Sequence, residues 1–269
     1  MIGHAHPLVA LLACGLAAGL VAGLVGAGGG IVAVPMLVQM LPWLGVTEVD
    51  LIQTATATSL VAMMPTALRG ALLQYRQGTL DIRWLRRLAP SIAGGTLLGC
   101  AATIALGRRM PAAVPAATMM LIGILMFQKP QAQAGSHQAV WFGFVDRLPV
   151  WSVGTLIGLL TATTGFGGAF LSVPYLASQR VDVRNAIGTG SGVALLVTMM
   201  ATLSFATFGL AEASHKCICW QAAFCIGFGA LCSVRMGVRF GRSLPRPALQ
   251  RVFACVLLIA AVASMVLRR

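Results

Sequence analysis

Apolar residues along this chain come in long blocks, separated by short stretches that hold most of the polar residues. The blocks are roughly 16–25 residues long, the length that an α-helix needs to cross a bilayer. The pattern predicts an all-α, polytopic helical membrane protein. The expected spans are 52–68, 88–106 and 111–127 in the first half of the chain, and 186–210, 217–234 and 252–267 in the second.

Each half begins with a glycine-rich apolar segment that does not fit one straight span. Residues 8–41 are apolar throughout, and a straight helix of that length would run ~51 Å. The run Gly26-Ala27-Gly28-Gly29-Gly30 is a poor helix interior, because each glycine costs about 1 kcal/mol relative to alanine. We therefore expect a break there, with a short helix beginning at about Ile31, and a matching one beginning at about Phe170.

The two halves are similar to each other in sequence. Residues 15–35 match 154–174 at an offset of 139, including five glycines and the Val-Pro pair that ends each segment. Two further matches follow in the same order: 57–59 with 189–191, and 106–111 with 240–245. The chain is predicted to be a tandem duplication, with a first repeat over 1–127, a linker over 128–149 and a second repeat over 150–269.

Composition supports the membrane class and weakens one alternative. Hydrophobic residues make up 58% of the chain and charged residues 9%, with a mean hydropathy of +0.88; soluble domains carry about 25% charged residues. The net charge of +13 could indicate nucleic-acid binding. However, the Lys and Arg residues lie mostly between apolar blocks, as the positive-inside rule predicts, so we expect a lipid bilayer and no nucleic acid as the partner.

The basic residues also predict how the glycine-rich segments cross the membrane. If each segment crosses once, the two sides carry 10 and 9 Lys and Arg residues, which gives no orientation. If each segment is a hairpin, the halves are inverted and the count becomes 14 to 5. The second count obeys the positive-inside rule. It predicts inverted repeats, each a glycine-broken hairpin plus three spans, with both termini outside the cytoplasm.

The two breaks are the predicted binding site. Backbone outside a helix is tolerated at membrane depth only within protein or beside a cavity, and a helix that starts there presents free N–H groups and a positive dipole end to a small anion. Hydroxyl side chains that recur in both halves could complete the lining. The candidate substrate-binding residues are Gly26, Gly28, Gly29, Gly30, Thr56, Thr58, Ser59, Gly165, Gly167, Gly168, Thr189 and Ser191.

Each candidate group has a structural alternative. The glycines of the breaks could serve only close helix packing, which is how we interpret Gly15, Gly19, Gly154 and Gly158. The hydroxyls could bond their own helix backbone. Three prolines, Pro35, Pro65 and Pro174, are candidate helix bends for a conformational change.

The predicted spans lack acidic residues and histidines, which bears on the transport mechanism. All six acidic residues and all four histidines fall outside the predicted spans, although an intramembrane carboxylate or histidine usually marks proton or cation coupling. No nucleotide-binding, metal-binding or enzymatic motif is present. We expect no cofactor, no metal, no catalysis, and a uniporter-like path in which the membrane potential helps anions outward.

Two rival functions remain at this point. An anion channel would share the same site. A membrane thiol–disulfide carrier would use Cys217, Cys219 or Cys100, but most of the seven cysteines lie in apolar blocks, whereas redox cysteines are accessible.

The motif GAGGGxxxVP, its echo GFGGxxxxVP and the hydroxyl-bearing span after each resemble the sulfite exporter TauE/SafE family over nearly the whole chain. The resemblance implies a secondary transporter of sulfite, thiosulfate or organosulfonates in a bacterial inner membrane. Ala169 stands where the first motif has Gly30, so the two half-sites need not be equivalent. The choice of anion, the direction of transport and the oligomeric state, including a homo-oligomer, stay open.

Overall fold

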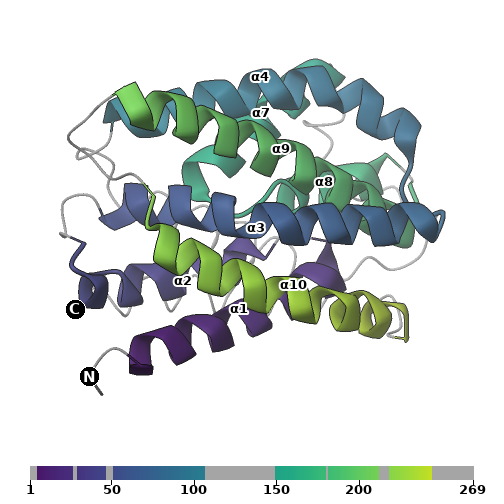
Figure 1. The fold of residues 1–269 in the computed structure, drawn as a ribbon. Coiled ribbons are helices and arrows are strands. Elements are labelled where there is room, and N and C mark those ends of the chain that lie inside the picture. The colour runs from purple at the N-terminus through teal and green to yellow at the C-terminus, as the bar shows by residue number, and fades with distance from the viewer. Residues whose placement is uncertain are drawn as a thin grey trace.

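A computed structural model describes residues 5–26, 29–46, 51–106, 149–179, 181–211 and 218–243 (Figure 1). The secondary structure of these residues is helical, without strands. In chain order the elements are α1 (Ala5–Val25), α2 (Gly30–Met40), a 3₁₀ turn η1 (Pro42–Leu44), α3 (Leu51–Arg76), α4 (Ile82–Leu106), α7 (Val150–Thr164), α8 (Ala169–Ser178), α9 (Val183–Ala211) and α10 (Trp220–Ser243).

Both predicted breaks are present. α1 ends at Val25 and α2 begins at Gly30, while α7 ends at Thr164 and α8 begins at Ala169. The short helices therefore begin within one residue of the predicted positions. α2 has 11 residues and α8 has 10, so each is about 15 Å long and reaches only half-way across a 30 Å hydrocarbon layer.

Among the described residues, four helices are long and apolar enough to cross a membrane: α3, α4, α9 and α10. They correspond to four of the six predicted spans, and the other two, 111–127 and 252–267, lie outside the described residues. The helices extend beyond the apolar blocks. α3 runs to Arg76 rather than 68, and α10 runs to Ser243 rather than 234, because polar and basic residues continue a helix readily once it leaves the hydrocarbon.

Helices from opposite halves of the chain pack side by side. α1 lies along α10, α4 lies along α7, and α3 lies against α9 in the centre. The outer pairs are in close contact at glycines. A Cβ on Gly15 or Gly19 would collide with the backbone of α10, and one on Gly158 would collide with that of α4, while Gly154 is pressed against the Ser91 side chain. The packing interpretation of these four glycines is confirmed.

The contacts also fix helix direction. Gly15 faces Ile226 and Gly23 faces Val234, so α1 and α10 run in the same direction; α3 runs with them because Gly227 and Gly70 pair it to α10 in the same order. After the turn at 77–81, α4 runs in the opposite direction to α3 (Figure 1). α7 and α9 lie beside α4 and run in the same direction as it. Helices α1, α3 and α10 therefore oppose α4, α7 and α9.

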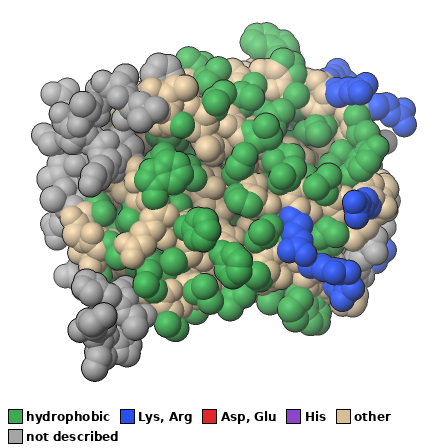
Figure 2. All heavy atoms as spheres, in the orientation of Figure 1, with side chains coloured by type: hydrophobic (Ala, Val, Ile, Leu, Met, Phe, Trp, Pro, Cys, Tyr) green, Lys and Arg blue, Asp and Glu red, His purple; other side chains and the backbone are tan. Residues whose placement is uncertain are grey.

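This arrangement collects basic side chains at one end of the bundle, which we call the basic end (Figure 2). The C-terminal ends of α3 and α10 lie there with the N-terminal ends of α4 and α9. Tryptophans mark both ends, with Trp84 and Trp151 at the basic end and Trp43 and Trp220 at the opposite one, as expected at the two interfaces of a bilayer. The arginines of the basic end are Arg69, Arg76, Arg83, Arg86, Arg87, Arg184, Arg235 and Arg239.

Candidate functional site at the two helix breaks

The first break is a glycine turn buried inside the bundle. Gly26 and Gly29 have positive φ angles of 71° and 75°, a backbone conformation that glycine adopts without strain. Gly29 precedes α2 as its N-cap residue, and no side chain caps the helix. A Cβ on Gly29 would lie 2.7 Å from the Ala18 carbonyl oxygen and 2.8 Å from Met63 Sδ. Both the conformation and the space therefore require glycine.

The second break is also a turn at glycines, but its N-cap residue Gly168 has a φ angle of −23°, unlike Gly29. Gly165 and Gly167 have φ angles of 77° and 72°. Gly168 is the N-cap residue of α8, again without a side-chain cap, and a Cβ on it would lie 2.7 Å from a Val193 methyl group. Gly28, the remaining glycine of the prediction, lies outside the described residues.

The two breaks meet each other. A Cβ on Gly30, the first residue of α2, would collide with the carbonyl oxygen of Gly165 and with the backbone of Phe166. A Cβ on Gly165 would lie 2.9 Å from a methyl group of Val34 in α2. The N-terminus of α2 is thus packed directly on the second break, which explains why position 30 has no side chain.

A serine from the opposite half lies against each break. Ser59 of α3 donates hydrogen bonds to the carbonyl oxygens of Gly165, at 3.0 Å, and of Thr56, at 2.9 Å. Ser191 of α9 lies beside Gly26, where a Cβ would be 2.9 Å from its hydroxyl, and it bonds the Ile187 carbonyl of its own helix at 3.3 Å. All of these residues are buried.

Two of the predicted hydroxyls have a different partner. Thr58 accepts a hydrogen bond from the backbone N–H of Cys219, and Thr189 accepts one from that of Asp81, each at 3.0 Å. Cys219 and Asp81 are the residues immediately before α10 and α4. Each threonine therefore accepts a hydrogen bond at the start of a neighbouring helix, so the two have the same structural role in the two halves.

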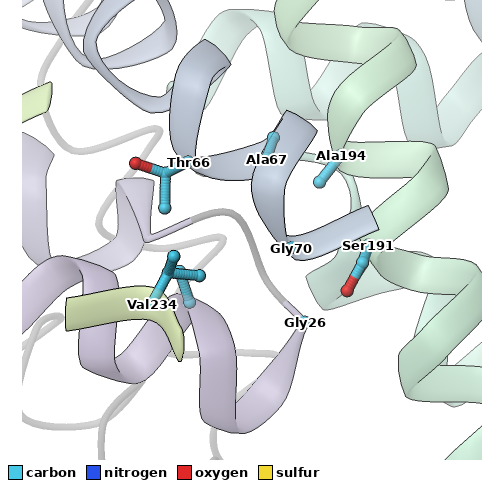
Figure 3. Close-up of a pocket in the computed structure, with 8 residues that line it drawn as sticks. Gly26, Thr66, Ala67, Gly70, Ser191, Ala194 and Val234 are labelled. Carbon is cyan, nitrogen blue, oxygen red and sulfur yellow. The ribbon is translucent and has the colours of Figure 1, made fainter. Parts of the chain in front are cut away.

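A small cavity lies beside the first break (Figure 3). Its volume is about 10 Å³, close to the space of one water molecule. The Thr66 hydroxyl on its wall is 1% exposed and has no hydrogen-bond partner among the described residues. The wall is formed by Ala22, Gly26, Thr66, Ala67, Gly70, Ser191, Ala194 and Val234.

Sequence reasoning missed several residues that the fold brings to the breaks. Phe166 lies inside the second motif but was not assigned a role, and Met63 touches Gly29 from the middle of a span. Gly70 falls outside the predicted span 52–68, whereas α3 continues to Arg76. The spacing Thr66-x-x-x-Gly70 keeps both residues on one helix face, and this is the signal that could have found them.

The arrangement offers hydrogen-bond donors and no fixed negative charge. The described acidic residues, Asp81 and Asp182, precede α4 and α9 at the basic end, and no contact of either carboxylate with a glycine of the breaks is found. No group of three His, Cys, Asp or Glu side chains in the described ranges could hold a metal ion. Two uncapped helix N-termini and nearby hydroxyls are chemically suited to a small anion.

In the part of the chain that the structure describes, a helical bundle with four membrane-length helices and two buried backbone breaks is typical of a polytopic membrane protein. The model of the sulfite exporter TauE/SafE family matches residues 11–264. The chain belongs to this family, as the paired glycine motifs predicted.

Curated relatives carry the same general description. A probable membrane transporter protein of Haemophilus influenzae is 29% identical over 248 residues, which cover 88% of this chain and 90% of the relative. The probable membrane transporter protein YdhB of Bacillus subtilis is 23% identical, with coverages of 90% and 92%. One from Xylella fastidiosa is 26% identical, with coverages of 88% and 87%. No solved structure gives a significant match.

Proposed function

We propose that this protein is a secondary transporter that exports a small sulfur-containing anion, such as sulfite, thiosulfate or an organosulfonate, by alternating access. The anion binds where the two breaks meet. The observation that carries the proposal is that two helices begin inside the bundle without side-chain caps, one of them in direct contact with the other break. Membership of a transporter family supports it.

Backbone dipoles can hold such an anion without an arginine in the hydrocarbon. The N-terminus of a helix is equivalent to about half a positive charge. Each such N-terminus stabilises a nearby anion by about 0.3–2 kcal/mol. The first N–H groups of α2 and α8 add hydrogen bonds that water would otherwise supply. Binding of this modest strength suits a carrier, because a substrate that is held too tightly is not released.

Helix directions support the hairpin and the inverted repeat. α1 and α3 run in the same direction, so α2 brings the chain back between them. α7 runs opposite to α1 and α9 runs opposite to α3, so matching helices of the two halves point in opposite directions. This is the plan of many secondary transporters with a site near the bilayer midplane.

The basic end supports an orientation. Under the positive-inside rule, the eight described arginines of this end face the cytoplasm, which places the start of α1, at the other end, on the periplasmic side of a bacterial inner membrane. A membrane potential that is negative inside then drives anions outward, by about 2.3 kcal/mol per charge per 100 mV. No proton- or cation-coupling residue is required.

Flux of labelled sulfite into liposomes that contain the purified protein tests the proposal. We expect saturable, voltage-dependent flux that is stimulated by unlabelled sulfite on the other side, as a carrier requires and a channel does not. Gly30→Ala should abolish flux because its Cβ would collide with Gly165. Gly94→Ala is the matched control, since a Cβ on Gly94 meets nothing within 4 Å. Folded protein without flux of sulfite, thiosulfate or a sulfonate would refute the proposal.

A further inference from the structure

The side chain of Arg69 turns away from the basic end and into the bundle. Gly70 of α3 lies level with Val234 of α10, yet the Nη1 of Arg69 donates to the carbonyl of Leu231, at 2.7 Å. Leu231 is the twelfth of the 24 residues of α10, so its carbonyl lies roughly 17 Å from either end of that helix. Because α10 is long enough to cross a membrane, the half-buried guanidinium lies near the middle of the bilayer.

No acidic residue within the described helices balances this charge. None of these helices contains an aspartate or a glutamate. A charged side chain inside a membrane is costly, and such residues usually mark the path of a substrate or an ion. A guanidinium has five N–H groups. The bond from Nη1 to Leu231 uses one of them, which leaves donors for an anion.

A buried hydroxyl without a partner lies on the neighbouring turn of α3. Thr66 is three residues before Arg69, so the two lie on one face of the helix. Thr66 is 1% exposed, and its hydroxyl has no hydrogen-bond partner among the described residues. Thr66 and Val234 both border the cavity beside Gly26 (Figure 3), and Val234 is three residues after Leu231. A charged donor and a neutral one are therefore brought to the same region next to the first break.

The second half of the chain lacks this pair. Under the offset that aligns α3 with α9, Ala201 stands where α3 has Arg69, and Ala201 is buried. Thr198, which corresponds to Thr66, donates to the Ala194 carbonyl of its own helix at 2.8 Å. Since α9 packs on α4 as α3 packs on α10, packing of this kind does not require an arginine.

We propose that Arg69 and Thr66 bind the substrate anion directly and add to the helix N-termini at the first break. The guanidinium pairs with the charge of the anion. The Thr66 hydroxyl donates to an oxygen that enters the cavity, whose volume of about 10 Å³ accommodates one oxygen atom. A divalent anion gains more from a fixed positive charge than a monovalent one, so this position also sets the preference for anion charge. The inference rests on the proposed function.

Flux of two labelled anions into liposomes tests the role of Arg69. Arg69→Gln removes the charge and keeps a donor for the Leu231 carbonyl. We expect the KM for thiosulfate, which is divalent, to rise about tenfold and that for methanesulfonate, which is monovalent, about threefold. Arg239→Gln makes the same charge change at an exposed position of α10 and should change neither KM. Equal rises for the two anions, or the same rises in Arg239→Gln, would show that Arg69 does not pair with the substrate.

Thr66→Val tests the hydroxyl without a change in charge. Because this hydroxyl has no partner among the described residues, valine should keep or raise the unfolding temperature, whereas both KM values should rise severalfold. A lower unfolding temperature with unchanged KM values would make Thr66 structural and overturn its role. Wild-type flux with KM values that neither variant alters refutes only the two binding residues, while folded wild-type protein that moves neither anion refutes the transport function.

Discussion

At the first break, the described residues between α1 and α2 are glycines alone, whereas the second break carries Phe166, which is 1% exposed. Yet the first residue of each turn has nearly the same φ angle, 71° at Gly26 and 77° at Gly165, while the N-cap residues differ, with 75° at Gly29 and −23° at Gly168. Each break also lies against a serine of the other half, Ser191 or Ser59.

The comparison separates two demands on the sequence. The turn and the uncapped helix start depend on backbone conformation, and both halves meet that demand with glycine. The volume around the turn depends on side chains, and there the halves differ, with Phe166 at one break and the cavity at the other. The glycine turn can therefore be kept in both halves while the space around it differs.

The largest effect is expected from Gly165→Ala compared with Gly45→Ala. Both positions have positive φ, but Gly45 has nothing within 4 Å, whereas Gly165 is surrounded by Ser59, Val34 and Thr56. Gly45→Ala should cost about 1 kcal/mol of backbone strain, and Gly165→Ala a further 1–3 kcal/mol, roughly, from overpacking. Thermal unfolding in detergent measures the difference, and equal losses would show that the second break is not tightly packed.

The serines test whether the breaks are energetically equivalent. Ser59→Ala leaves the buried Gly165 carbonyl without this hydrogen bond, which should lower the free energy of unfolding by about 1–3 kcal/mol. Ser191→Ala removes a longer bond within its own helix and should cost under about 1 kcal/mol. Chemical denaturation of the two variants compares them; a cost for Ser191→Ala as large as that for Ser59→Ala would make the breaks equivalent.

Substitutions of Thr58 and Thr189 should give the smallest loss of stability, and the loss should be equal for the two residues. Thr58→Val and Thr189→Val each remove one acceptor from the N–H before a helix, so each should cost about 1 kcal/mol, as the loss of a cap does. The measurement is the shift in unfolding midpoint for each variant and for the double variant. A shift for only one of them would contradict a matched structural role.

Much of the fold could be predicted because glycine runs and apolar lengths are local signals. Both breaks were placed within one residue, at 31 and 170 against 30 and 169. The C-terminal ends of α3 and α10 were not predicted correctly, because the length of an apolar block indicates where the chain crosses the hydrocarbon layer and not where the helix ends. For the site, Thr58 and Ser59 could not be told apart by sequence. They are neighbours on α3, but a turn of about 100° per residue directs one to the start of α10 and the other to Gly165.

The packing of α1 on α10 has a consequence for how the chain is made. α1 is synthesised before α10, and its glycine face has its partner only when α10 has been synthesised, some 200 residues later. Until then that face is in contact with lipid or with the insertion machinery. We expect nascent chains that stop before α10 to be short-lived, which pulse-chase degradation of truncated chains would measure. A contact that stabilises the folded bundle would then also decide how long an unfinished chain survives.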